Sequence, residues 1–227
     1  GTSGSAWAAD TVARLQAMPN VRVMSRTTVI GAFDHGVYGA VERVSDHLKV
    51  PADGKPRQIL WRITSKRAIL CAGATERPIV FENNDRPGIM QASAIRAYLN
   101  RWAVTPAQQV AIFTNNNDGH RTASDLVAKG VDIVSVIDTR ADAPTSSDYD
   151  VIAGGLIDQT WGRLGLKQIE VKMPKGGIRR IKCGALGVSG GWNPNVHLTC
   201  HQRGRPVWND AIAAFVPGGT MPAGMTV

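Results

Sequence analysis

Long hydrophobic runs are absent from this sequence, and its opening residues, GTSGSAWAAD, contain neither a basic stretch nor an apolar core. A helix that crosses a membrane needs about 20 mainly apolar residues, and a secretory signal needs an apolar core of about 7–15 residues. The sequence therefore predicts neither kind of segment. We expect a cytoplasmic protein with no membrane partner.

Cysteine is scarce, because Cys71, Cys183 and Cys200 are an odd number at wide spacing. A disulfide framework needs paired cysteines, and a zinc site usually contains a CxxC pair. We therefore predict neither a disulfide nor a metal site. His197 and His201 are four apart, but prolines on both sides argue against a long helix that would pair them. Cys71 lies in an apolar stretch and is expected to be a small core residue.

Aromatic residues are also few, at 6%, and none lies in the densest basic stretch, KMPKGGIRRIK at 172–182. A nucleic-acid surface combines basic side chains with aromatic side chains that stack on bases. The 26 basic and 18 acidic residues give a net charge of +8, and the basic residues are otherwise scattered. We expect an anionic cofactor or an acidic protein partner, and no nucleic acid.

The chain does contain enough apolar material for a folded core. Its 227 residues are 43% apolar, and a chain of this length buries about 70–75% of its unfolded surface. Runs of β-branched residues alternate with helical patterns, which predicts an α/β protein. We expect helices over 6–18 and 92–104, strands over 21–24, 27–33, 166–173 and 178–183, and a buried strand over 68–72.

The stretch AIFTNNNDGHRTASDLVAKGVDIVSVIDTR, residues 111–140, predicts the first strand, helix and second strand of a dinucleotide-binding unit. The fingerprint G-x-G-x-x-G falls on Thr114, Asn116 and Gly119, so only the third glycine, which packs the helix against the strand, is present. The two glycines that admit a pyrophosphate are replaced. Asp118 also places a negative charge where the helix start would attract a phosphate. We predict a Rossmann shape that binds no dinucleotide.

Asp138 ends the second strand of this unit, about 20 positions beyond the loop, which is the spacing of an acidic residue that binds ribose. A strand-end cap satisfies the same spacing, so both interpretations stay open. His120 is expected at the surface rather than as a proton carrier. Because no Ser-His-Asp or paired-carboxylate arrangement stands out, we predict no catalytic residue.

In the stretch SKRAILCAGATERP at 65–78, the apolar run ends in the small residues CAGA at 71–74. Small residues let a backbone approach a ligand closely. The stretch resembles the A-T-G motif of the two-dinucleotide flavoproteins, the thioredoxin reductase and disulfide reductase group. Their chain leaves the FAD domain there, builds an inserted NAD(P) domain and returns through a G-x-x-P-N-x-x-L loop, which GWNPNVHL at 191–198 matches. The resemblance implies an FAD/NAD(P)-binding Rossmann-like fold. A partial first domain would span 1–104 and 183–227, with a smaller, degraded Rossmann-like domain inserted over 105–182.

Three longer strings, at 26–48, 74–104 and 189–218, resemble the α subunit of heterotetrameric sarcosine oxidase, and the likeness runs from about residue 6 to 219. Subunits of hydrogen cyanide synthase and opine oxidase share part of it. This family implies a bacterial cytoplasmic complex that oxidises sarcosine to glycine, formaldehyde and hydrogen peroxide. Its α subunit holds NAD, FAD and FMN lie elsewhere in the complex, and tetrahydrofolate binds through a downstream domain.

The resemblance also implies which residues border the cofactor. The first glycine fingerprint of the family would precede residue 1 and its last small-residue strand end would follow residue 227, so we expect an inner segment of a longer subunit that holds one edge of the NAD site. Two residues match the strand that meets the adenine, two match the A-T-G position, and five match the return loop. They are Thr28 and Val29, Ala72 and Gly73, and Ser189, Gly190, Gly191, Pro194 and Val196.

Other interpretations stay open at the level of sequence. Each of these positions could serve ordinary turn or strand packing. The inserted part could be a docking module for neighbouring subunits or for an electron-transfer partner, which an extensive apolar patch over 108–182 would favour. The same scaffold could also belong to an oxidase of opines or of other secondary amines.

Overall fold

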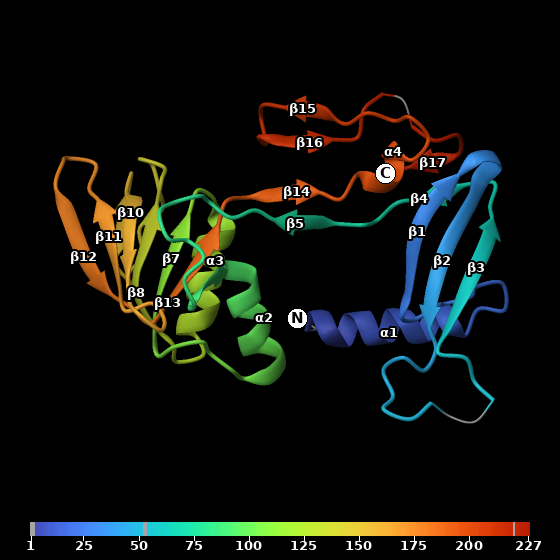
Figure 1. Ribbon diagram of the computed structural model, residues 1–227, viewed down its shortest axis with the longest axis horizontal. Coiled ribbons are helices and arrows are strands. Elements are labelled where there is room, and N and C mark those ends of the chain that lie inside the picture. Colours follow the sequence, from blue (N-terminus) through green and yellow to red (C-terminus); the bar gives the residue numbers. More distant parts are fainter. Residues whose placement is uncertain (1–2, 52–53, 220) are drawn as a thin grey trace. The chain divides into compact units, whose positions relative to one another are not determined.

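The computed structural model describes residues 3–51, 54–219 and 221–227 (Figure 1). The chain forms two compact units: an outer unit, Gly1–Ala72 with Asn195–Val227, and an inner unit, Gly73–Pro194. These bounds differ from the predicted boundaries at 104/105 and 182/183. The reason is that helix α2 (Ala92–Trp102) and the strands on either side of the predicted insert pack into the sheet of the inner unit.

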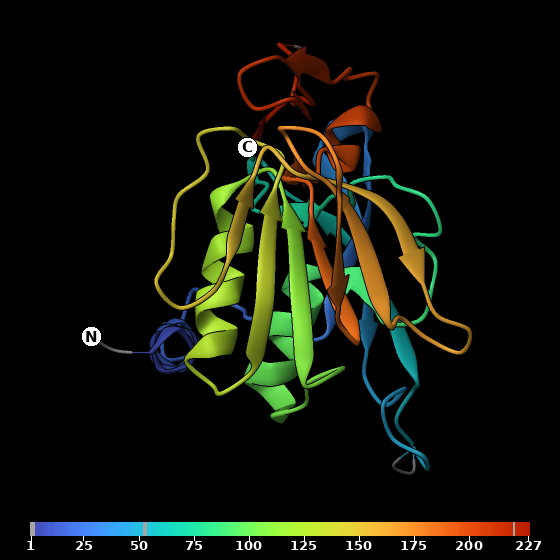
Figure 2. The ribbon, with the colours of Figure 1, turned by 90° about the vertical axis from the view of Figure 1, so that its left-hand side faces the viewer.

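A parallel sheet forms the centre of the inner unit (Figure 2). Its strand order is β6-β13-β7-β8-β9, and every neighbouring pair is parallel. The middle strand is β-branched and apolar, with five of its six residues buried, as expected for a strand covered on both faces. The strands are β6 (Ile89–Gln91), β7 (Gln109–Thr114), β8 (Asp132–Asp138), β9 (Val151–Ala153) and β13 (Ala185–Ser189).

Two layers cover this sheet. Helices α2 and α3 (Asn117–Val127) lie on one face, where Ile95 and Leu126 pack against Ile112 and Val136. The other face is covered by an antiparallel sheet of β10 (Leu156–Trp161), β11 (Gln168–Lys172) and β12 (Ile178–Lys182). The strand–helix–strand unit and the β11–β12 hairpin confirm the sequence predictions. Strands β9 and β10 were not predicted, because β9 is only three residues long and β10, LIDQTW, contains polar residues directly after the glycine pair at 154–155.

The outer unit contains helix α1 (Gly4–Gln16) and an antiparallel sheet in the order β1-β2-β3. A single turn, η1 (Asp34–Gly36), joins the first two strands. The short elements of the unit are a parallel pair, a hairpin and one helical turn. The strands are β1 (Thr27–Phe33), β2 (Val37–Arg43), β3 (Gln58–Thr64), the pair β4 (Ala68–Ile69) and β17 (Met225–Thr226), and the hairpin β15 (Val207–Asn209) and β16 (Ala214–Val216), with the turn α4 (His197–Cys200).

Three sequence predictions fail in the outer unit. No strand forms over 21–24. The predicted buried strand at 68–72 is reduced to β4, whose Ile69 is 78% exposed, and Cys71 is exposed rather than a core residue. Within the described residues β4 pairs only with β17, so little covers it. Helix α1 forms but buries none of its residues.

No helix in the described ranges combines the length and the apolarity that crossing a membrane requires.

Truncating the core of the inner unit should destabilise it strongly. Ile112 is fully buried between the sheet and both helices, so Ile112→Ala is expected to lower the free energy of unfolding by about 2–5 kcal/mol. The control is Leu164→Ala, since Leu164 is 91% exposed and its loss should change stability by less than about 0.5 kcal/mol. Urea unfolding followed through the amide signals of β7 and β8 measures both. Equal effects of the two variants would contradict the described core.

Candidate functional site

The strand order of the inner sheet reverses between β7 and β13. The chain proceeds from β7 to β8 and β9 on one side, and then returns to β13 on the other. Open α/β sheets bind their ligands beyond the carboxyl ends of the strands at such a reversal. Ser189 of β13 pairs with Thr114 of β7, so the loops that follow, 114–116 and 189–191, lie together. We call these two loops the switch point.

Two asparagines join the loops of the switch point. The Asn116 side chain donates from Nδ2 to Ser189 O at 3.1 Å and to Ser189 Oγ at 3.2 Å. The backbone N–H of Asn115 donates to Ser189 O at 3.3 Å, and its Nδ2 donates to Gly190 O at 3.4 Å. Ser189 and Gly190 are both buried. The side-chain amide of Asn116 therefore occupies a place where an intact fingerprint has glycine.

The turn itself survives through a local hydrogen-bond network. Thr114 Oγ1 accepts from Asn116 N at 3.1 Å and donates to Asn116 O at 3.0 Å. Asn116 Oδ1 accepts from Asp118 N at 2.9 Å and so caps helix α3. A Cβ on Gly119 would lie 2.4 Å from the Thr114 side chain. The third glycine thus has the packing role that the sequence predicted for it.

The carboxylate of Asp138 is fully hydrogen-bonded within the protein. Its side chain is fully buried and accepts from Arg140 N at 2.9 Å and from Arg140 Nη2 at 2.7 Å. His120 Nε2 lies 2.8 Å from Asp138 Oδ2, and because an ionised carboxylate can only accept, the imidazole donates this bond. Burial alone would raise the pKa of Asp138, but the hydrogen bonds from Arg140 and His120 outweigh it and hold the pKa below the ordinary 3.8. His120 is only 8% exposed, so its predicted surface position was wrong.

These contacts decide how a dinucleotide would fit the inner unit. Thr114 and Asn116 fill the positions that admit a pyrophosphate, and Asn116 already satisfies the backbone donor of Asp118 at the helix start. The carboxylate expected for the ribose is committed to His120 and Arg140. The residues present at the switch point do not fit a dinucleotide.

The return loop is held from its other side by backbone. Gly190 N donates to Arg77 O at 2.7 Å, and Arg77 N donates to Gly191 O at 2.8 Å. A Cβ on Gly190 would lie 2.9 Å from two backbone oxygens, and Gly191 has φ +96°. Beyond this loop β14 (Trp192–Pro194) pairs with β5 (Ala74–Glu76). The two sequence motifs, far apart along the chain, are therefore antiparallel neighbours in the inner unit.

Gly73 differs from the glycines of the return loop. It has φ +67°, and no atom lies within 4 Å of the position that its Cβ would take. The neighbours Ala72 and Ala74 are exposed as well. In the outer unit Asn195 Nδ2 donates to Ala72 O at 2.9 Å, a contact that sequence reasoning missed although the P-N pair of the return motif contains the residue. The exposed backbone at this motif fits close approach by a ligand.

The nine expected cofactor residues divide between the units. Gly73, Ser189, Gly190, Gly191 and Pro194 belong to the inner unit, and Thr28, Val29, Ala72 and Val196 to the outer unit. Thr28 and Val29 are exposed on β1 and pair with β2.

Val196 immediately precedes α4, which contacts β1. His201 Nδ1, just after α4, accepts from Ala32 N at 3.2 Å, so His201 serves this junction. The described residues contain no group of three or more metal-ligating side chains.

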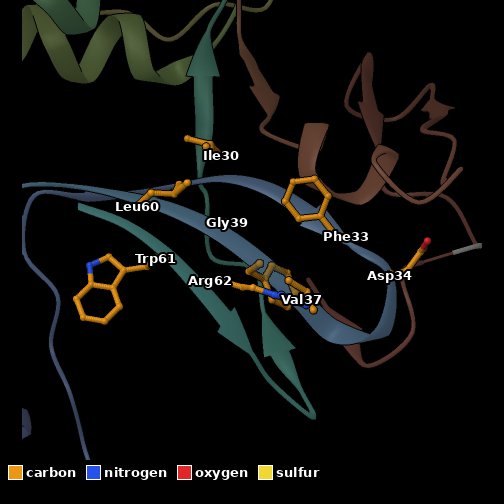
Figure 3. Close-up of a pocket in the computed structure, with 9 residues that line it drawn as sticks. Ile30, Phe33, Asp34, Val37, Gly39, Leu60, Trp61 and Arg62 are labelled. Carbon is orange, nitrogen blue, oxygen red and sulfur yellow. The ribbon is translucent and has the colours of Figure 1, made fainter. Parts of the chain in front are cut away.

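An apolar hollow of about 540 Å³ lies on the β1–β2–β3 sheet (Figure 3). The Phe33 ring covers Gly31 and Gly39, where a Cβ would come within 2.7 Å and 3.2 Å of it. None of the nine expected cofactor residues lines the hollow. Its lining is Ile30, Phe33, Asp34, Val37, Tyr38, Gly39, Leu60, Trp61 and Arg62.

Comparison with known proteins identifies relatives over almost the whole chain. A sarcosine oxidase subunit alpha from Rhizobium meliloti (strain 1021) is 43% identical over 225 residues, covering 97% of this chain and 22% of that protein. One from Corynebacterium sp. (strain P-1) is 38% identical over 231 residues, covering 96% of this chain and 24% of that protein. The chain thus spans less than a quarter of the length of these curated relatives. No family model matches it.

Solved structures share the fold at lower identity. L-proline dehydrogenase from P. horikoshii has a TM-score of 0.64 at 20% identity, over 92% of this chain and 36% of its own. An FAD-dependent pyridine nucleotide-disulphide oxidoreductase from Desulfovibrio vulgaris has a TM-score of 0.55 at 12% identity, over 86% of this chain and 53% of its own. The predicted FAD/NAD(P)-binding, Rossmann-like α/β fold is confirmed.

Removing the Asp138 charge should destabilise the inner unit in a pH-dependent way. Asp138→Asn is expected to cost about 3 kcal/mol near neutral pH, because it breaks a buried charge pair. A lowered folded-state pKa stabilises above the unfolded value and loses its effect as pH falls through the folded value. The gap between wild type and variant should therefore narrow below about pH 4. Urea unfolding from pH 3 to 8 measures the gap, with the exposed Asp85→Asn as control; a constant gap would contradict the assignment.

Proposed function

On the premise that this chain belongs to the family of sarcosine oxidase α subunits, we propose that it contributes part of an NAD site to a bacterial cytoplasmic complex. That complex oxidises sarcosine to glycine, formaldehyde and hydrogen peroxide, with tetrahydrofolate as the one-carbon acceptor. FAD and FMN bind elsewhere among the partner subunits. The segment supplies no catalytic residue, and its role is to bind and orient the dinucleotide.

The exposed, side-chain-free backbone at Gly73 is the observation that carries this proposal. It is open, whereas the backbone at Gly190 is closed by the chain itself. On either side of the open position, Asn195 Nδ2 bonds to Ala72 O in the outer unit, and β14 pairs with β5 in the inner unit. A backbone without a Cβ lets a planar or phosphorylated ligand come within hydrogen-bonding distance.

NAD is a hydride carrier when bound. The residues of this chain that would hold it are the nine named above. Thr28 and Val29 would face the adenosine, and Ala72 with Gly73 would offer backbone to it. In the return loop, Gly190 to Val196 would border the cofactor, with Ser189 supporting the loop from below because its side chain is fully buried. The Rossmann-like sheet and helices of the inner unit then support the return loop and bind no second dinucleotide.

A second candidate function, subunit docking, is favoured by the outward face of the β10–β11–β12 sheet. The strand register places Leu156 and Ile178 in one row across Lys172, and Trp161 in a row with Lys182. Leu156 is 48% exposed, Trp161 47%, Ile178 55% and Leu164, in the adjoining loop, 91%. The two rows lie at opposite ends of β10 and contain Lys172 and Lys182 as well, and a surface that mixes exposed apolar and charged side chains suits contact with a protein partner. The occupant that fits the family is another subunit of the same complex.

Blocking the open backbone should weaken NAD binding. Gly73→Ala adds a methyl group where the ligand would approach, and we expect the dissociation constant for NAD to rise about tenfold. Gly130→Ala is a matched control, since Gly130 also has positive φ, at +81°, and open space around its Cβ position, but lies outside the site. Titration calorimetry on the full-length subunit measures both. Equal effects of the two variants would remove Gly73 from the site, and no NAD binding by the wild type would overturn the proposal.

Charge on the exposed apolar face should impair assembly. Leu164→Asp places a carboxylate at a highly exposed apolar position in the loop between β10 and β11, and burying an unpaired charge at an interface is costly. We expect at least about a tenfold loss of co-purifying partner subunits. Val104→Asp is the control, because Val104 is 51% exposed and lies just after α2, which lies on the other face of the parallel sheet. Size-exclusion chromatography of the co-expressed complex reports the result, and intact assembly with Leu164→Asp would exclude docking here.

A further inference from the structure

The side chain of Asn116 performs two tasks through its two ends. Oδ1 accepts from Asp118 N and caps helix α3, while Nδ2 donates to both oxygens of Ser189. Nδ2 also lies 3.0 Å from Asn115 Oδ1. The oxygen end thus serves the inner unit's own helix, and the nitrogen end restrains a different segment, the return loop.

The start of the return loop, Ser189–Gly191, has few restraints from its own side chains. Gly190 and Gly191 have no side chains, and Gly191 holds a positive φ that costs other residues strain. Glycine loses more backbone entropy on ordering than any other residue. The loop is therefore ordered from outside, by Arg77 on one side and by Asn115 and Asn116 on the other.

We propose that Asn116 is a positioning residue for the dinucleotide site. It uses the place that a pyrophosphate would take in an intact Rossmann unit to clamp the Ser189–Gly191 segment, so that the loop is preorganised for NAD bound at the Gly73 motif. This inference rests on the proposed function. The switch point, which does not fit a dinucleotide itself, thereby supports the NAD site proposed at the Gly73 motif.

Preorganisation explains why the clamp affects affinity rather than chemistry. A loop that must be ordered during binding subtracts its ordering entropy from the affinity, and a loop held beforehand does not. The clamp is built from buried acceptors, because Ser189 is fully buried and Gly190 is buried. Hydrogen bonds to such groups are costly to leave unmade. Loss of the Nδ2 donor should therefore loosen the loop locally, without unfolding the sheet below it.

The test separates the two ends of the side chain. In the full-length subunit, Asn116→Asp keeps the oxygen that caps α3 and removes the Nδ2 donor. We expect the dissociation constant for NAD to rise about tenfold, with faster amide exchange at Gly190 and Gly191. The matched control is Asn117→Asp, one residue along, which brings the same charge change at an exposed position and should leave the dissociation constant within about twofold. Ser189→Ala, which removes one of the two acceptors, should weaken NAD binding by about two- to threefold.

The outcomes are distinct. A raised dissociation constant measured well below the thermal midpoint, with the amides of β7 and β13 still protected from exchange, supports positioning, whereas a merely structural role would lower the midpoint and leave affinity below it unchanged. Wild-type affinity in Asn116→Asp overturns this inference and leaves the proposed NAD site standing. Equal weakening by Asn116→Asp and Asn117→Asp assigns the effect to charge and also overturns it. If the wild type itself binds no NAD, both this inference and the proposed function fail.

Discussion

The pairing of β7 with β13 is the constraint on which the rest of the inner unit depends. These strands are far apart in sequence, and their parallel register places Thr114 beside Ser189. That register alone brings the loop after β7 against the return loop, so the asparagines of one can bond to the backbone of the other. Both core clusters of the unit include residues from these two strands. A shift of one residue would exchange the buried faces and separate the loops.

Internal bonds have replaced ligand bonds at each position where a dinucleotide-binding unit meets its cofactor. The helix start is capped by Asn116, the loop positions hold Thr114 and Asn116, and the strand-end carboxylate of Asp138 is bonded to Arg140 and His120. A buried carboxylate must find such partners, since an unpaired buried charge is costly. The fold remains because its packing glycine and its apolar strands do not depend on the ligand.

Prediction from sequence succeeded where the signal was local and periodic. The unit at 111–140 and the strands predicted at 166–173 and 178–183 formed as expected, because a strand–turn–helix pattern and short apolar runs bounded by glycine and proline are local signals. The prediction of a buried strand at 68–72 failed, because the apolar residues there predicted burial but few described neighbours cover them. The prediction that His120 is exposed failed for the opposite reason. Its burial depends on Asp138, a neighbour in space that spacing along the chain does not reveal.

The sequence by itself determined the fold class, the family resemblance and the loss of two fingerprint glycines, because each of these is written in residue types at fixed spacing. Only the tertiary structure decided what replaced those glycines and which backbone stayed open. Hydrogen-bond partners such as Asn116 with Ser189, or Asn195 with Ala72, are chosen by strand register between distant segments. No local pattern shows that Gly73 is open while Gly190 is closed, because the atoms that close Gly190 come from Arg77 and Pro78.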